Sequence, residues 1–198
     1  MHRREYYALI SHLDQQIGRI LDSLERSGKA DNTWIFFTSD HGLAVGNHGL
    51  FGKQNMYDHS IRVPFIVVGP SVPADHRISA PIYLQDAMAT SLELAGIKRP
   101  EWVEFRSLVP LIQGKTNQSP YAAIYGAYTH LQRCVVVDNW KLIQYPTAGV
   151  VRLYDLKNDP LELRDVANGK EHATRIIELL AELQDLQIQF DDPLRKGN

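Results

Sequence analysis

The sequence predicts an α/β fold in two parts: a partial sheet with helices, followed by a small antiparallel sheet packed by a C-terminal helix. Three observations predict this fold. Two short apolar runs, WIFFT and VPFIVV, lie between segments of helical periodicity. From residue 121 onward, short strand-like segments follow one another with turn residues between them. An amphipathic helix pattern then closes the chain.

The first amphipathic helix is expected over residues 3–27, where apolar side chains recur at spacings of three and four. Gly28 follows it and suits the left-handed position just past a helix end. Gly18 lies inside the helix, where glycine costs about 1 kcal/mol relative to alanine, so it indicates close packing against a neighbour. Further helices are expected over 84–95 and 176–190.

The runs WIFFT (34–38) and VPFIVVGP (63–70) predict strands buried on both faces, because each is short and continuously apolar. The stretch 39–62 between them is rich in Gly, His and Asn and has little periodicity. It predicts a long ordered loop, and such loops in compact domains are usually functional. The later strands are expected at YAAIYGAYT, RCVVVDN, WKLIQY and VVRLYDL. The polar segment 115–120 divides the chain into residues 1–115 and 116–198.

The composition excludes several classes of protein. The formal net charge is −2 and the basic residues are scattered, so there is no electrostatic basis for binding nucleic acid. No apolar stretch approaches the roughly 20 residues that span a bilayer. Cys134 is the single cysteine, which excludes an intrachain disulfide and a cysteine-based zinc site and leaves a buried core thiol as the expectation. The chain opens directly in helical periodicity, without a signal-peptide apolar segment, and we expect it to be the later part of something longer.

The segment TSDHGLAVGNHGLFGK (38–53) carries the polar groups that point to chemistry. Asp40 and His41 directly follow an apolar strand, at the kind of strand end where α/β sheets bind ligands. A carboxylate and a neutral imidazole can together hold a divalent cation. Lys53 ends the segment as a point cation suited to an anionic oxygen. The pattern predicts a metal and oxyanion site, whereas Asp-His-Gly alone would equally suit a carboxylate that caps a turn.

The stretch DNTWIFFTSDHGLAVGNHGLFGKQNMYDHSIRVPFIVVGP resembles the C-terminal half of sulfatases of the alkaline phosphatase superfamily. The later segments YLQDAMATSLELAGIKRP, SLVPLIQG and RLYDLKNDPLEL are similar to family segments in the same order, so the resemblance covers nearly the whole chain. It implies an alkaline-phosphatase-like fold and the hydrolysis of sulfate esters of small molecules or glycans. Departures from the usual family residues, which concern local turns, occur at Ala89, Phe105, Arg164 and Asp165.

The resemblance implies roles for individual residues of the segment. Asp40 and His41 match two ligands of a calcium ion, which is magnesium in some members. Lys53 matches the lysine that contacts the sulfate ester. His48 matches a position whose role varies within the family; loop architecture is the more frequent role and substrate contact the other.

The family's nucleophile motif matches no segment of this chain. Family members use a formylglycine made from Cys-x-Pro-Ser-Arg or a related serine motif, and N-terminal aspartates complete their metal site. Cys134 lies in QRCVVVDNW, where no such motif follows. We therefore expect the formylglycine in an upstream half and expect the isolated chain to be inactive and to bind calcium weakly. We also expect an exposed apolar sheet edge that pairs with that half or with other copies of the chain.

Two other functions stay open at this point. Phosphatases, phosphonate hydrolases and phosphomutases of the same superfamily also place an Asp-His pair after a strand. A non-catalytic module that retains the fold is the third interpretation. The residue at the nucleophile position would distinguish the enzymes, because cysteine favours a sulfatase and threonine or unmodified serine favours phosphoryl transfer. Complete sulfatases are often exported, but the sequence leaves the localisation of this chain open.

Overall fold

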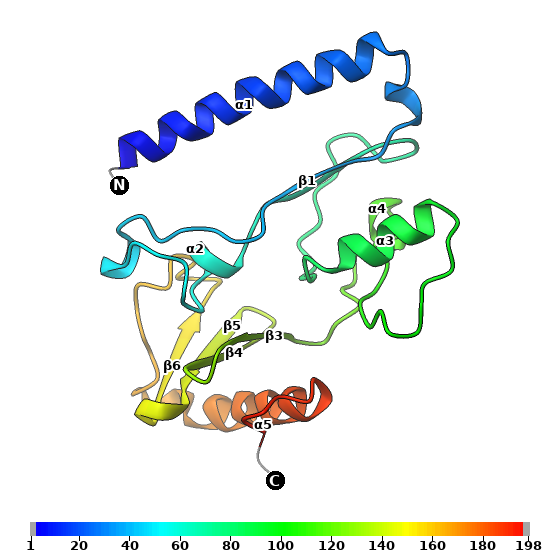
Figure 1. Cartoon of the computed structure of the whole chain (residues 1–198). Coiled ribbons are helices and arrows are strands. Elements are labelled where there is room, and N and C mark those ends of the chain that lie inside the picture. The colour runs from blue at the N-terminus through cyan, green and yellow to red at the C-terminus, as the bar shows by residue number, and fades with distance from the viewer. Residues whose placement is uncertain (1–2, 196–198) are drawn as a thin grey trace.

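The computed structural model describes residues 3–195 and contains two separate antiparallel sheets (Figure 1). In the first, β1 (Ile35–Thr38) pairs with β2 (Phe65–Val68). The second is a meander in the order β3-β4-β5-β6. Its strands are β3 (Ile124–Tyr128), β4 (Gln132–Val137), β5 (Trp140–Tyr145) and β6 (Val150–Asp155). The mixed α/β class and the antiparallel second sheet expected from the sequence are confirmed.

The expected long helices are α1 (Arg3–Arg26), α3 (Asp86–Leu94) and α5 (Ala173–Gln189), and each lies within a few residues of its predicted bounds. Two further helices, α2 (Asp58–Ile61) and α4 (Val109–Ile112), have four residues each and were not predicted. Helices of about one turn are too short to show an amphipathic period, so the sequence pattern cannot reveal them. No helix within residues 3–195 is both long enough and apolar enough to cross a bilayer.

Helix α1 runs along the outside of the molecule and has no buried residue (Figure 1). Gly28 follows it with a φ of 67°, as its C-terminal position predicted. The close packing expected at Gly18 is wrong for the described residues, because a Cβ built there would have no neighbour within 4 Å. Ile10, Leu13 and Ile20 on this helix are 46%, 54% and 66% exposed. The amphipathic face of α1 is therefore uncovered in this chain.

The β1–β2 sheet is covered on one face. Phe36 and Phe65 pack inward on the core around Leu108. Ile66 and Val68 point away from that core and are 53% and 55% exposed. The expectation that these strands are buried on both faces is therefore wrong for the described residues, because the chain supplies a covering layer for only one side.

The meander sheet has both faces covered, and α5 covers the first. Val135, Leu142 and Leu153 lie opposite one another on β4, β5 and β6 and have no exposed surface. They pack against Leu179 and Leu183 of α5. This is the C-terminal helix on a small sheet that the sequence predicted.

The second face of the meander sheet packs against the segment that follows β1. Cys134 and Ile143 are fully buried there and contact Met56 and Tyr57. Cys134 is a core thiol, as expected, and burial raises its pKa to about 11. The two parts of the chain are thus joined through the long loop, whose residues Met56 and Tyr57 pack on the second face of the meander sheet.

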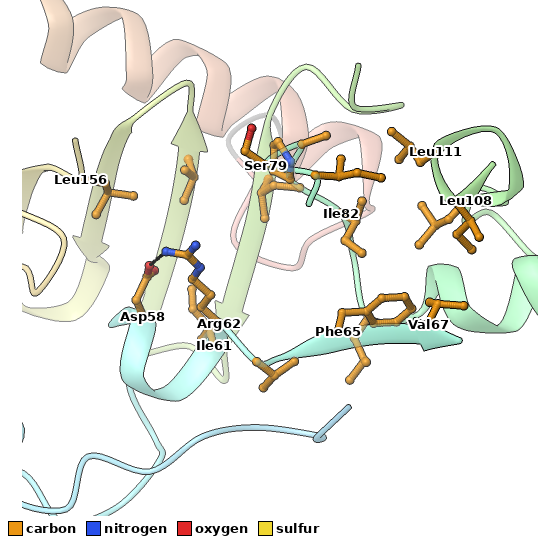
Figure 2. Close-up of a pocket in the computed structure, with 18 of the residues that line it drawn as sticks. Asp58, Ile61, Arg62, Phe65, Val67, Ser79, Ile82, Leu108, Leu111 and Leu156 are labelled. Carbon is orange, nitrogen blue, oxygen red and sulfur yellow. Dashed lines mark ion pairs between the residues drawn. The ribbon is translucent and has the colours of Figure 1, made fainter. Parts of the chain in front are cut away.

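A pocket of about 570 Å³ opens between β2, the segment before α3, α4 and the meander sheet (Figure 2). Its wall is largely apolar and includes Phe65, Ile82 and Leu111. At one end, Arg62 lies 3.5 Å from Asp58. This pocket opens on the core-facing side of β2, the side opposite the exposed Ile66 and Val68.

Candidate active site

The segment after β1 is shaped by a side-chain hydrogen bond of its own and held against α2 by a backbone hydrogen bond. Ser39 Oγ donates to the His41 carbonyl at 2.8 Å, and Gly42 N donates to the Ser60 carbonyl at 2.8 Å. A Cβ on Gly42 would lie 2.1 Å from the His59 carbonyl oxygen. Only glycine permits this approach of two backbones, so the sequence Asp-His-Gly positions its first two side chains at the strand end.

Asp40, His41 and Lys53 lie together in the structure. His41 Nε2 is 3.2 Å from Asp40 Oδ2, and the Lys53 ammonium contacts the same nitrogen although Lys53 is 12 residues further along the chain. The Asp40 side chain is 81% exposed and the His41 side chain 32% exposed. The long loop therefore folds back on itself and brings a carboxylate, an imidazole and an ammonium to one accessible point.

The hydrogen bonds of His41 indicate its tautomer. Nδ1 lies 3.0 Å from the Gly42 carbonyl oxygen, which can only accept a hydrogen bond, so Nδ1 carries the proton. In the neutral ring the Nε2 lone pair then accepts from the Lys53 ammonium, and Asp40 Oδ2 lies beside it as a second acceptor. A carbonyl that orients the other ring nitrogen in this way is the usual partner of a metal-binding histidine.

This donor set fits a divalent cation in part. One carboxylate and one imidazole lone pair are adjacent, but within residues 3–195 no group of three or more His, Cys, Asp and Glu side chains could hold a metal ion. A calcium ion takes roughly 6–8 oxygen ligands, so Asp40 and His41 can supply only a minority of them.

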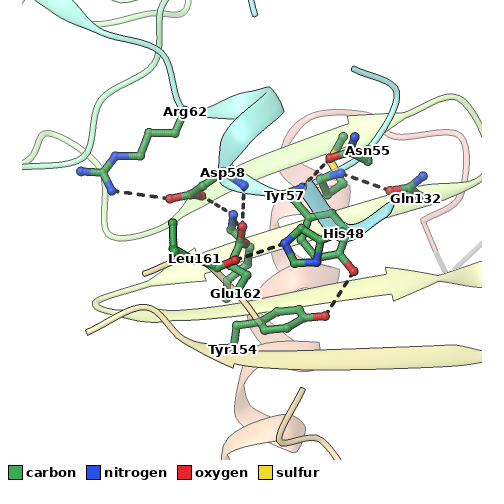
Figure 3. Close-up of polar contacts among 11 residues, drawn as sticks. His48, Asn55, Tyr57, Asp58, Arg62, Gln132, Tyr154, Leu161 and Glu162 are labelled. Carbon is green, nitrogen blue, oxygen red and sulfur yellow. Dashed lines mark hydrogen bonds and ion pairs between the residues drawn. The ribbon is translucent and has the colours of Figure 1, made fainter. Parts of the chain in front are cut away.

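His48 joins the loop to the segment that follows β6 (Figure 3). Its Nε2 donates to the Leu161 carbonyl at 3.1 Å, and its ring stacks on Tyr57 with 4.0 Å between ring centroids and 10° between planes. His48 has a φ of 53°, a left-handed conformation. These contacts favour the architectural of the two roles that the sequence left open for this residue.

A buried charge cluster, which the sequence analysis missed, holds α2 on the meander sheet (Figure 3). Lys141 on β5 is fully buried; its ammonium contacts Asp58 and lies 2.6 Å from Glu162 Oε1. Glu162 also accepts a hydrogen bond from Asp58 N at 2.7 Å. Burial acts to lower the Lys141 pKa, but the two carboxylates outweigh it and the net pKa is raised, so Lys141 stays charged. A lysine inside the apolar run WKLIQY was the available signal.

Gln132 on β4 holds the chain just after Lys53. Its Oε1 accepts from Met56 N at 3.2 Å, and its Nε2 donates to the Gln54 carbonyl at 3.4 Å. The meander sheet therefore positions the end of the loop that carries the lysine, which is a second contribution that local sequence did not reveal.

The comparisons with known proteins place this chain in a family. Residues 46–189 match the family described as N-sulphoglucosamine sulphohydrolase, C-terminal. The chain belongs to the sulfatases. The choline-sulfatase of Rhizobium meliloti is 36% identical over 172 residues, which cover 84% of this chain and 33% of the relative.

Solved structures agree with this assignment. A protein in complex with its substrate D-glucosamine-2-N,6-O-disulfate superposes with a TM-score of 0.86 at 30% identity, over 94% of this chain and 40% of that one. The phosphonate monoester hydrolase of Agrobacterium radiobacter superposes with a TM-score of 0.81 at 26% identity, over 93% and 40%. The expected sulfatase family and its alkaline-phosphatase-like fold are confirmed, and this chain spans about a third of the length of its curated relatives, 33% for the choline-sulfatase.

Proposed function

We propose that this sulfatase chain supplies one side of an active site that hydrolyses sulfate esters, and that the reaction belongs to a complete protein with an upstream part. One observation carries the proposal: Asp40, His41 and Lys53 meet at one accessible point at the end of β1. The division of the chain into residues 1–115, as the C-terminal portion of the catalytic domain, and 116–198, as a small subdomain, is part of the same proposal.

Each of the three residues has a chemical role in this proposal. Asp40 and His41 would hold a calcium ion, or a magnesium ion in its place, through a carboxylate oxygen and the Nε2 lone pair. When bound, such a cation stabilises the negative oxygens of an ester. Lys53 binds a sulfate oxygen as a point charge and neutralises charge that grows on it during cleavage. His48 holds the loop that carries Lys53 against the segment after β6.

The proposed substrates are sulfated small molecules or glycans. The names of the related proteins support this class, because one is a choline-sulfatase and one was solved with a disulfated glucosamine. A second candidate is phosphonate ester hydrolysis, favoured by the likeness to the phosphonate monoester hydrolase. A metal and a lysine would bind either tetrahedral oxyanion, so the site geometry alone serves both reactions.

The test is co-expression of this chain with an upstream sulfatase segment that carries the formylglycine motif. We expect the complex to hydrolyse nitrophenyl sulfate faster than nitrophenyl phenylphosphonate. Asp40→Ala and Lys53→Met should each lower the rate at least about 100-fold, the size expected when a group that stabilises developing charge is removed. Lys157→Met, a matched change at an exposed lysine, should leave the rate unchanged. Preference for the phosphonate would support the second candidate, and full activity of both site variants would overturn the proposal.

The isolated chain is expected to be inactive toward nitrophenyl sulfate and to bind calcium weakly. Two protein ligands leave most of the coordination shell to water. Titration calorimetry with calcium chloride measures the affinity of the isolated chain for calcium. Tight stoichiometric binding that Asp40→Ala abolishes would mean that the chain contains a self-sufficient metal site.

A further inference from the structure

A second pocket, of about 350 Å³, lies between the loop that follows Lys53 and the meander sheet. Residues 48–57 of the loop form one side, and β4, β5 and β6 form the other. Its lining residues are His48, Leu50, Gln54, Asn55, Tyr57, Gln132, Tyr145 and Arg152. None of these side chains is acidic, and most carry hydrogen-bond donors. The pocket is therefore polar and has one permanent positive charge, on Arg152.

The pocket is adjacent to the proposed sulfate contact. Gln54, which lines it, directly follows Lys53 and accepts a hydrogen bond from Lys53 N at 3.2 Å. Gln132 of the pocket binds the Gln54 carbonyl and so holds this wall in place. A substrate whose ester lies at Lys53 would have its alcohol part within reach of this pocket.

Arg152 is oriented by neutral groups. Its Nη1 donates to the Tyr57 hydroxyl at 3.2 Å, and its guanidinium lies 5.8 Å from the centre of the Tyr145 ring. Within residues 3–195 no carboxylate forms an ion pair with it. Arg152 is thus held in one direction by a hydroxyl and a ring, without a counter-charge, and its remaining N–H groups suit a two-oxygen anion.

We propose that this pocket binds an anionic substituent, a carboxylate or a second sulfate, on the alcohol part of a sulfated sugar, with Arg152 as its cationic anchor. Tyr145 supplies an aromatic surface, while Asn55 and Gln54 offer amides to hydroxyl groups. The position of the pocket relative to the cleaved ester rests on the proposed function, whereas the binding of an anionic sugar does not require hydrolysis.

The test is an NMR titration of the chain in its co-expressed complex with the upstream segment, with only this chain isotope-labelled, followed through the backbone and side-chain amide signals of Gln132 and Asn55. The probes are methyl glucuronide, methyl glucoside 6-sulfate and the neutral methyl glucoside. We expect one or both anionic sugars to bind at least about tenfold more tightly than the neutral sugar, because a charge-assisted hydrogen bond is roughly twice as strong as a neutral one. The stronger of the two anionic probes identifies the anion.

Variants separate this pocket from the sulfate contact. Arg152→Met should remove the preference for anionic sugars, while Arg152→Lys should weaken the binding but keep the preference. Arg164→Met, at an exposed arginine that lines neither pocket, should bind like the unmodified chain. Lys53→Met should leave binding here unchanged even though it is expected to lower turnover in the complex at least about 100-fold. Equal binding of all three sugars, no binding, or full anion preference in the folded Arg152→Met chain would overturn the proposal.

Discussion

Lys141 carries its charge in the interior of the molecule, and its two partners come from distant parts of the chain. Asp58 lies on α2, 83 residues before it, and Glu162 lies 21 residues after it. Glu162 is 2% exposed, and its burial, only partly offset by Lys141, raises its pKa. The cluster is stable only while charge and counter-charge are both present, since an isolated buried charge is costly.

The substitution Lys141→Met should lower the free energy of unfolding by about 3–5 kcal/mol, because it leaves the buried Glu162 carboxylate without its cation. Urea denaturation followed by circular dichroism measures this. Lys157→Met, at an exposed lysine, is the control and should change stability by less than about 0.5 kcal/mol. A Lys141→Met chain as stable as the control would show that the cluster contributes no net stabilisation.

Asp192 anchors the segment after α5 to the meander sheet. Arg133 reaches its two oxygens at 2.7 and 3.0 Å, and the Tyr125 hydroxyl also donates to it. Burial acts to raise the Asp192 pKa, but these hydrogen bonds outweigh it and the net pKa lies below the ordinary value. The folded chain therefore binds this proton less readily than the unfolded chain does.

The Asp192 contribution to stability should be complete above the unfolded pKa, roughly pH 4, and should be lost as the pH falls through the lower folded pKa. Asp192→Asn should therefore unfold more easily at pH 7 and show a flatter loss of stability between pH 5 and pH 3. Urea titrations across this range test it. Asp191→Asn is the control, because that aspartate is 87% exposed. Parallel pH profiles for Asp192→Asn and the unmodified chain would contradict the assignment.

At the scale of elements, the segment 39–53 is an extended loop that other elements hold in shape. Arg3 of α1 donates to the Val45 carbonyl at 3.0 Å and to Asn47 at 3.1 Å. Gly42 fits against α2, and His48 binds Leu161 in the segment after β6. The position of Asp40, His41 and Lys53 thus depends on contacts with three separate elements.

Gly42→Ala should destabilise the folded chain by about 1–3 kcal/mol, because the added methyl group would overlap the His59 carbonyl and force the two backbones apart. In the co-expressed complex it should also reduce turnover. Gly18→Ala is the matched control: its Cβ meets open space in a helix, so it should stabilise the isolated chain by up to about 1 kcal/mol. Chemical denaturation measures the free energy of unfolding of both variants. Equal changes in that free energy would exclude the steric explanation.

At the scale of the whole molecule, three apolar surfaces are uncovered. They are the apolar face of α1, the exposed Ile66–Val68 side of the β1–β2 sheet and, on the opposite side of that sheet, the 570 Å³ pocket (Figures 1 and 2). Large exposed apolar surfaces commonly mark interfaces. The chain also matches only about a third of the length of its curated relatives. Together, the two observations favour an upstream half as the proposed partner of this surface.

We expect the isolated chain to self-associate or to be only marginally stable, and the upstream segment to make it soluble. Size-exclusion chromatography and thermal melting with and without that segment measure this. Ile66→Lys should reduce self-association, since a charge on an exposed strand opposes edge and face pairing. Ile97→Lys, at an isoleucine of similar exposure outside the sheets, should not. A monodisperse, highly stable monomer that the segment leaves unchanged would show a self-sufficient domain.

The sequence by itself determined the features that depend on near neighbours in the chain. The bounds of α1, α3 and α5, the order of strands in the meander and the buried state of Cys134 all follow from local periodicity and apolar runs. The segment with Asp40, His41 and Lys53 was also visible, because its residues lie within a span of 14 positions that resembles a family segment.

The tertiary structure alone decided which surfaces are covered and what holds the loop. The spacing of apolar residues shows that a strand or helix has an apolar face, but other segments supply the layer that covers it. The burial expected for α1 at Gly18 and for both faces of the first sheet was therefore wrong. His48 meets Leu161 across 113 residues, and Lys141 meets Asp58 across 83. Such pairs are brought together only by the packing of the meander sheet beneath the loop, and no spacing along the chain encodes them.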